Sequence, residues 1–204
     1  MSHTDPWQEV VAQVKPAVLL VETSSGQGTG FIVARGGFAV TCWHVIKGET
    51  TVTVGMSDGT ELPASVYGSD LIVDLAVLTL SRDIDVSPLC FARPEEIQEG
   101  AAVMAIGHPL GFSFSISRGV VSNRARVFNG VSYVQTDTAL NPGNSGGPIV
   151  NSEGEVVAVA DWVVRGGAAG PGPQGLGFGV AVPHVLAVLA RYRVPLFQKN
   201  RGSS

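Results

Sequence analysis

Short segments rich in apolar and β-branched residues recur along this chain, and glycine or other turn residues end each of them. In the first half, six segments have the spacing of strands in all-β proteins. They are Ala17–Glu22, Gly30–Arg35, Phe38–Cys42, Thr51–Met56, Leu62–Tyr67 and Leu75–Leu80. The turn sequences Arg35-Gly36-Gly37 and Ser57-Asp58-Gly59 suit hairpins between neighbouring strands. Six strands with few helices predict a closed barrel.

A second series of segments follows, with turn sequences at Asn129-Gly130 and Glu153-Gly154. Its members are Ala101–Ile106, Ser115–Ser122, Val131–Asp137, Gly147–Asn151, Val156–Val164 and Phe178–Val182. Between the two series, Ser81–Gly100 contains acidic residues and two prolines without sustained periodicity, which is typical of a connection. The predicted fold class is therefore all-β, with two six-stranded barrels.

Helical patterns are confined to the two ends of the chain. The segment Trp7–Val14 is amphipathic, follows the capping sequence Asp5-Pro6 and ends before Pro16. The segment His184–Arg193 has helical spacing of its apolar residues and predicts a closing helix. The Gly/Pro-rich stretch Gly166–Gly175 has too few apolar side chains to pack, so we expect a mobile loop there.

These boundaries predict one domain over residues 1–204, because a chain of this length suffices for one large domain or two closely packed small ones. We expect the N-terminal barrel to occupy residues 16–85 and the connection residues 86–100. The C-terminal barrel is expected over residues 101–183, and a C-terminal helix and tail over residues 184–204.

Composition argues against several classes of function. The formal net charge is −4 and the basic residues are scattered, so we expect no nucleic-acid partner. No apolar run approaches the roughly 20 residues that span a bilayer, and the amino terminus lacks the basic-then-apolar pattern of a secretory signal. We therefore expect no membrane partner and predict a cytoplasmic location. Cys42 and Cys90 form no CxxC motif and the histidines lack metal-ligand spacing, so we expect neither a metal site nor a cofactor.

The stretch Thr136–Asn151, TDTALNPGNSGGPIVN, carries the strongest chemical signal. Glycines on both sides of Ser145 permit positive φ angles and the close approach of a substrate carbonyl. In such a turn the N–H groups of Gly143 and Ser145 would converge where negative charge develops during acyl transfer. Ser145 is therefore the candidate nucleophile, and the backbone of Gly143 and Ser145 is the candidate oxyanion hole.

A serine hydroxyl needs a base within hydrogen-bond reach and a third group that orients the base. Of the four histidines, His44 is the best placed, because it follows a strand in TCWHVIKG. Asp74 immediately precedes the apolar strand Leu75–Leu80, so both residues would lie at strand ends of the first barrel. Asp70 competes as the carboxylate, but we expect it to cap the turn as an Asx side chain.

The blocks TCWHVI, VDLAVL and TDTALNPGNSGGPIV, in this order, resemble the three catalytic blocks of chymotrypsin-fold serine proteases, most closely the HtrA/Deg branch. The resemblance extends from about Trp7 to Val188. It implies two perpendicular barrels, with His44 as general base, Asp74 as orienting carboxylate and Ser145 as nucleophile of a serine endopeptidase. Polypeptides are then the substrates. Members of this branch often trimerise through the amino-terminal segment, so a homotrimer is also implied, and we expect no PDZ domain.

The same resemblance implies an apolar specificity pocket. Ala139 stands six positions before Ser145, where a trypsin-like enzyme needs an aspartate to pair with a basic side chain. The pocket walls implied by the HtrA branch are Leu140, Val164 and Phe178, and Phe178 stands where a smaller aliphatic residue is common. We therefore expect a shallow pocket and cleavage after small or medium aliphatic residues.

Two alternatives compete with this interpretation. The sequence GNSGG also matches the nucleophile elbow of α/β-hydrolases, and Asp161 and His184 follow Ser145 in that family's order. An elbow requires a strand, a sharp turn and a helix, whereas strands are predicted after Ser145. Asp161 is instead expected to point toward solvent or a backbone amide. The second alternative is a protease-fold module that binds extended peptides by strand addition with little turnover.

Overall fold

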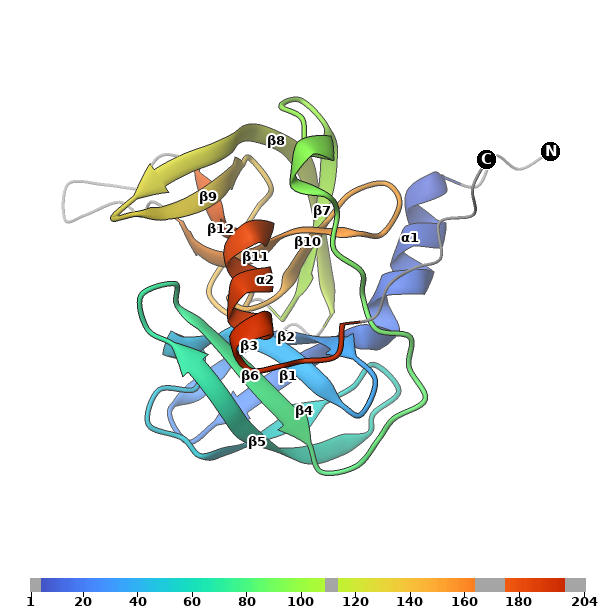
Figure 1. The fold of residues 1–204 in the computed structure, drawn as a ribbon. Coiled ribbons are helices and arrows are strands. Elements are labelled where there is room, and N and C mark those ends of the chain that lie inside the picture. The colour runs from blue at the N-terminus through green and yellow to red at the C-terminus, as the bar shows by residue number, and fades with distance from the viewer. Residues whose placement is uncertain (1–4, 109–113, 164–174, 197–204) are drawn as a thin grey trace.

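The computed structural model describes residues 5–108, 114–163 and 175–196, and this part of the chain forms two closed barrels (Figure 1). The first barrel has the strand order β1-β2-β3-β6-β5-β4. Its strands are β1 (Val18–Thr23), β2 (Gly26–Ala34), β3 (Phe38–Cys42), β4 (Thr51–Gly55), β5 (Glu61–Asp70) and β6 (Leu75–Leu80). All neighbouring pairs are antiparallel, and the two predicted turn sequences join β2 to β3 and β4 to β5.

The second barrel repeats this architecture with the strand order β10-β11-β12-β9-β8-β7, again antiparallel. Its strands are β7 (Ala102–Gly107), β8 (Ser115–Phe128), β9 (Val131–Thr136), β10 (Pro148–Val150), β11 (Val156–Val163) and β12 (Gly177–Ala181). Asn129 and Gly130, with φ of 52° and 81°, form the turn between β8 and β9. The predicted all-β class and the two six-stranded barrels are confirmed.

Short helices flank the barrels. In α1 (Pro6–Val14) the Asp5 side chain accepts a hydrogen bond from the Trp7 N–H at 3.0 Å, as the capping sequence predicted. In α2 (Val182–Arg191) the first turn contains Pro183, so the helix starts earlier than the predicted His184. The described residues also contain 3₁₀ turns that the sequence did not predict: η1 (Lys15–Ala17), η2 (Trp43–Val45) and η3 (Pro94–Glu96). Among the described residues, no helix has the length and apolar character needed to cross a membrane.

The strand β8 is longer than predicted, because it continues beyond Ser122 to Phe128. Its first half pairs with β7 and its second half with β9, so one long strand serves two neighbours. Register shifts interrupt the β8–β9 pairing on both sides of Asn123. Most of the second half is exposed, and it therefore lacks the apolar alternation by which a half-buried strand is recognised.

The helix α2 follows the last strand of the second barrel and contacts the first, and Figure 1 shows it lying between the two barrels. Its Arg191 guanidinium donates to the Asp70 carboxylate at 2.7 Å. The Tyr192 hydroxyl, just beyond the helix, donates to the Ser69 carbonyl at 2.8 Å and accepts from the Ser69 N–H at 3.1 Å. Gly68 gives the tyrosine ring its space, because a Cβ at this position would lie 2.2 Å from a ring carbon of Tyr192.

Replacing Gly68 by alanine should displace this ring and loosen the contact between α2 and β5. We expect Gly68→Ala to lower the free energy of unfolding by about 1–3 kcal/mol, the usual cost of overpacking. The matched control is Gly55→Ala in β4, because a Cβ there would meet Leu20 at an ordinary 3.5 Å. Urea denaturation measures both variants, and equal stabilities would contradict this account of the docking.

Candidate active site

Strand pairing brings His44 and Asp74 together although they are far apart in the sequence. His44 lies in η2, directly after β3, and Asp74 directly precedes β6. These two strands are neighbours, and Cys42 at the end of β3 pairs with Leu75 at the start of β6. Both residues therefore lie at the same end of the first barrel, as the sequence predicted, and the His44 side chain is 45% exposed.

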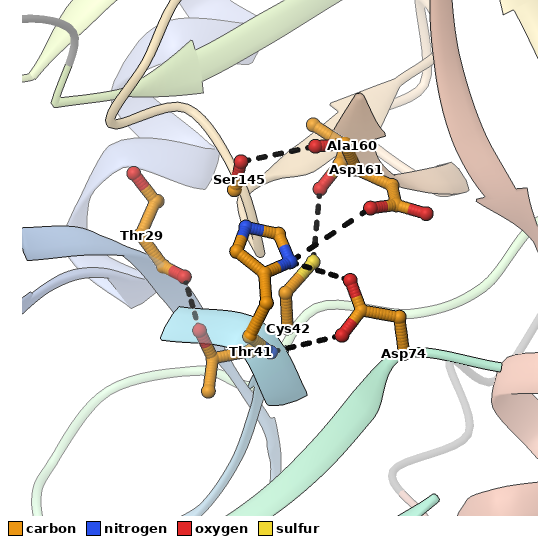
Figure 2. Close-up of polar contacts among 8 residues, drawn as sticks. Thr29, Thr41, Cys42, Asp74, Ser145, Ala160 and Asp161 are labelled. Carbon is orange, nitrogen blue, oxygen red and sulfur yellow. Dashed lines mark hydrogen bonds and ion pairs between the residues drawn. The ribbon is translucent and has the colours of Figure 1, made fainter. Parts of the chain in front are cut away.

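The Asp74 carboxylate holds His44 at two points. Its Oδ1 accepts a hydrogen bond from the main-chain N–H of His44 at 2.8 Å, and its Oδ2 pairs with the imidazole Nδ1 (Figure 2). The Asp74 backbone has a left-handed φ of 58°, and its carbonyl accepts from the Trp43 N–H at 3.1 Å. Left-handed backbone is strained for most residues but tolerated by aspartate. Since Asp74 contacts both the main chain and the side chain of His44, this turn fixes the orientation of the imidazole ring.

The competing carboxylate, Asp70, has the structural role that the sequence predicted. Its Oδ1 accepts from the N–H groups of Ile72 and Val73 at 3.0 and 3.1 Å, which forms the Asx turn between β5 and β6. Its other oxygen binds Arg191 of α2. Asp70 therefore shapes the loop that carries Asp74 and does not contact the imidazole.

The loop that carries Ser145 is held between the two barrels. From β2, the Thr29 N–H donates to the Ser145 carbonyl at 2.9 Å, and the Gly146 N–H donates to the Ala160 carbonyl of β11 at 2.7 Å. Gly146 has a φ of 86°, and a Cβ there would lie 2.2 Å from the Thr29 carbonyl oxygen and 2.4 Å from Thr41 Oγ1. Only glycine fits this position, so the GNSGGP sequence determines how closely the barrels approach at the candidate nucleophile.

The Ser145 hydroxyl donates to the main-chain carbonyl of Asp161 at 3.0 Å (Figure 2). Among the described residues, no hydrogen bond joins this hydroxyl to His44. Hydrogen bonds between a nucleophile and its base are often long or absent before substrate binds. The hydroxyl must therefore leave the Asp161 carbonyl before it can donate to the imidazole.

Gly143, one of the two predicted oxyanion-hole residues, is fixed from the first barrel. Its φ is 101°, and its carbonyl accepts from Thr29 Oγ1 at 2.6 Å. The same Thr29 oxygen accepts from the main-chain N–H of the buried His108 at 3.1 Å. The backbone bonds found in the described part of the chain leave the N–H groups of Gly143 and Ser145 without a backbone acceptor. The oxyanion hole itself stays a prediction.

The electrostatics of the site favour a basic imidazole. The hydrogen bond that His44 donates to Asp74 raises the pKa of His44 above its ordinary value of 6.5, although burial acts in the opposite direction. The negative charges of Asp74 and Asp161 raise this pKa further. Neutral His44 is consequently a stronger proton acceptor than a histidine in water.

A small pocket, with a cavity volume of about 20 Å³, lies beside Ser145. Its lining residues are Leu140, Asn141, Asn144, Ser145, Ala160, Asp161 and Trp162. Of the four residues predicted for the specificity pocket, only Leu140 is in this lining. Ala139 is exposed and is not part of this lining. The ring of Phe178 is buried against that of Trp162, with ring centroids 4.2 Å apart. Val164 and most of the predicted Gly166–Gly175 loop lie outside the described residues.

Two residues join the site that the sequence analysis did not place there. Asp161 was expected to face solvent or a backbone amide, and this is wrong: its side chain is 6% exposed and its Oδ1 lies 4.0 Å from His44 Nδ1. Cys42 is fully buried, and its Sγ donates to the Ala160 carbonyl at 3.3 Å. The one available signal for Asp161 was an acid inside the apolar strand sequence VVAVADWVV.

The nucleophile-elbow alternative does not fit the structure. The chain continues from Ser145 into the strand β10 rather than into a helix. His184 lies on α2, where its Nε2 accepts a hydrogen bond from the Ser132 N–H at 2.9 Å. His184 therefore has a structural partner in the second barrel.

Comparison with known proteins agrees with this geometry. The trypsin-like peptidase domain matches residues 28–159, which include all three predicted catalytic residues. The chain therefore belongs to the trypsin-like peptidase family. Within this family its similarity is to serine proteases of the DegP/HtrA type.

Three relatives show the extent of this similarity. A probable periplasmic serine endoprotease DegP-like of Hahella chejuensis is 38% identical over 82% of this chain and 36% of its own length. The putative serine protease HhoB of Synechocystis is 35% identical over 77% of this chain and 38% of its own. The structure of the HtrA-type protease AlgW with a decapeptide superposes with a TM-score of 0.81 and 26% identity, over 92% of this chain and 67% of that one. The chain thus spans little more than a third of these curated relatives.

The predicted cytoplasmic location is contradicted by these comparisons. The DegP-like relatives from Hahella chejuensis and Halomonas elongata are both named as periplasmic proteins. The prediction rested on the lack of a long apolar run and of a secretory-signal pattern in the sequence, and these features do not decide the compartment.

The lack of space for a Cβ at Gly146, between Thr29 and Thr41, gives a prediction for the site. We expect Gly146→Ala to slow covalent labelling of Ser145 by a fluorophosphonate at least 100-fold, because the new Cβ pushes the loop away from Thr29 and Thr41. Gly59→Ala is the matched control, since Gly59 has nearly the same φ, 87°, but nothing within 4 Å of an added Cβ. Both variants incur the left-handed strain of about 1–2 kcal/mol, so only the clash distinguishes them. Equal labelling rates would contradict the fit.

Proposed function

We propose that this chain is a serine endopeptidase that hydrolyses exposed or unfolded polypeptide through an acyl-enzyme. The two-point hold of Asp74 on His44 is the observation that carries the proposal. It assigns the Nδ1 proton to the side of Asp74, and thereby makes Nε2 the nitrogen that accepts a proton. No other function accounts as well for a left-handed aspartate, an oriented imidazole and a serine held in a glycine turn.

In the proposed cycle, the Ser145 hydroxyl leaves the Asp161 carbonyl, transfers its proton to His44 Nε2 and attacks the scissile carbonyl. The N–H groups of Gly143 and Ser145 stabilise the resulting oxyanion. His44 gives the proton to the leaving amine and then activates the water that hydrolyses the acyl-enzyme. Because neutral His44 is the base, hydrolysis declines as the pH falls through the raised pKa of His44.

The proposed substrates have a small or medium aliphatic residue before the scissile bond. Leu140 provides an apolar wall, and the buried Phe178 ring fills the space against Trp162. The Asp161 carboxyl lies beside Asp74 and His44, so it is engaged away from a basic substrate side chain. Burying an unpaired ammonium costs several kcal/mol, whereas burying a valine-sized side chain gains roughly 1.5–3 kcal/mol.

A peptide-binding module with little turnover is the second candidate. The resting hydrogen bond from Ser145 to the Asp161 carbonyl favours it, because the hydroxyl is not on the base. Fluorophosphonate labelling separates the two candidates, since only an activated serine reacts. The homotrimer implied by the family resemblance belongs to the same proposal, and the molar mass in solution tests it.

The division of roles among the histidines gives a direct test. We expect Ser145→Ala and His44→Ala to abolish casein hydrolysis, with a loss on the order of 10⁶-fold as in other serine proteases. His184→Ala should keep most of the activity, because its partner is the Ser132 N–H rather than a residue of the site. An inactive His184→Ala beside an active His44→Ala would exclude the proposed base.

The pocket gives a second test, which is read from cleavage products of denatured casein by mass spectrometry. We expect sites after Val, Ala and Leu in the wild type. In Phe178→Val we expect a shift toward larger apolar residues, because Trp162, which lines the pocket, loses the ring that it packs against. One methylene contributes only ~1–3 kcal/mol to such discrimination, so several residues should be accepted. Phe38→Val in the first barrel is the control and should leave the pattern unchanged. Cleavage mainly after Lys and Arg would reject the apolar pocket.

A further inference from the structure

The side chain of Asp161 lies inside the proposed catalytic cluster although the mechanism above uses only its main-chain carbonyl. Its carboxyl lies within 4.8 Å of that of Asp74, and its Oδ1 lies 4.0 Å from His44 Nδ1. The polar atoms of Cys42, His44, Asp74 and Asp161 all lie within 4.8 Å of one another. Figure 2 shows the labelled Cys42, Asp74 and Asp161 side chains converging at this point.

An irregularity in the second barrel explains why Asp161 points inward. In the pairing of β11 with β12, Ala160 faces Gly179 and Trp162 faces Phe178, so Asp161 has no partner residue of its own. A residue that is extra in one strand forms a β-bulge, which changes the direction of its side chain. The bulge lets the Asp161 carbonyl accept from Ser145 while its carboxyl turns toward the first barrel.

Two carboxyl groups this close, with the Asp161 side chain only 6% exposed, disfavour a second negative charge. Burial, followed by the charge of Asp74, raises the pKa of Asp161 to about 8. No Lys or Arg ion pair among the described residues reaches either carboxyl. A protonated Asp161 at this place can donate a hydrogen bond to the Asp74 carboxylate.

The other titratable groups that face Asp161 agree with a surplus of negative charge. Burial raises the pKa of the Cys42 thiol well above its ordinary value, and burial raises that of Tyr133 to about 12. In both cases the charges of Asp161 and Asp74 act in the same direction. His44 is the one group of this cluster that can become positive, so its charge depends on whether Asp161 is protonated.

A metal ion is the other occupant that such donors suggest. The donor atoms already have protein partners: Cys42 Sγ donates to the Ala160 carbonyl, and His44 Nδ1 pairs with Asp74. With these bonds made, a proton satisfies the two carboxyls without any movement. The observations thus favour a proton over an ion, and the experiment below distinguishes them.

We propose that Asp161 is a positioning residue for the His44–Asp74 pair: its protonated carboxyl donates to Asp74, holds that carboxylate against Nδ1 and moderates the basicity of His44. The proposal rests on the proposed function. When the proton leaves Asp161, two carboxylates face Nδ1 and favour the imidazolium, which cannot accept a proton from serine. The protons of Asp161 and His44 therefore titrate as a coupled pair.

Asparagine at position 161 separates the two effects, because its amide can donate to Asp74 but never ionises. We expect Asp161→Asn to keep the orientation of His44 and to leave the imidazole with a single titration step, since no second carboxylate can form beside Nδ1. Asp161→Ala removes the donor and should slow fluorophosphonate labelling of Ser145 about tenfold or more. Asp85→Asn makes the same side-chain exchange at an exposed position outside the cluster and is the control.

The first measurement is an NMR titration of the imidazoles in protein that carries ¹⁵N-histidine, and the His44→Ala variant identifies the His44 signal. The second is the rate of fluorophosphonate labelling of Ser145 as a function of pH. In the wild type and in Asp85→Asn, we expect the His44 signal to titrate in two coupled steps. In Asp161→Asn we expect a single step, at a lower pH than the upper step of the wild type. Near pH 8, where Asp161 begins to ionise in the wild type, Asp161→Asn should be labelled several-fold faster than the wild type. The titration can be read even in a protein that hydrolyses nothing, so failure of the proposed function and failure of this inference are distinguishable.

Three results would overturn the inference. An identical His44 titration in the wild type and Asp161→Asn would show that Asp161 is not coupled to the imidazole. Equal labelling rates for Asp161→Asn and Asp161→Ala would show that donation to Asp74 is unimportant. Inhibition by added Zn²⁺ that EDTA reverses and Asp161→Asn abolishes, with a single-step titration in EDTA, would show that the cluster holds a metal ion rather than a shared proton.

Discussion

The close contact of the Ser145 loop with both barrels is the constraint on which the site depends. The first barrel supplies His44 and Asp74, and the second supplies Ser145 and Asp161. Main-chain hydrogen bonds from Thr29 and to Ala160 hold the loop from its two sides, and the missing Cβ of Gly146 lets the barrels approach. The distance between His44 and Ser145 is therefore a property of barrel packing rather than of either barrel alone.

Local sequence carried most of the information about this site. The strands that precede His44 and follow Asp74 are short and apolar, and their pairing brings the two residues together as expected. Only glycine tolerates the φ angles and contacts around Ser145, so this loop leaves a specific sequence signature. The Asx turn of Asp70 could be predicted for the same reason, because its hydrogen bonds reach only two and three residues along the chain.

Features that depend on contacts between distant elements could not be predicted in this way. The inward direction of Asp161 comes from a bulge whose position is set by the register of β11 against β12. The place of Cys42 near the imidazole depends on how the two barrels pack, since its Sγ donates from the first barrel to the Ala160 carbonyl of the second. The pocket lining differed from prediction because Trp162 packs on Phe178 and itself borders the cavity. The compartment was predicted wrongly because it is not a property of the fold.

The left-handed backbone of Asp74 restricts which residues can replace it during evolution. Aspartate, asparagine and glycine tolerate such a φ, whereas β-branched and bulky residues do not. A relative that lost activity could keep the turn by carrying asparagine or glycine here, and would still fold. Any bulkier replacement would disturb the Trp43 contact and the entry into β6. At the turn that places Asp74 beside His44, some replacements would therefore remove the carboxylate and still preserve the fold.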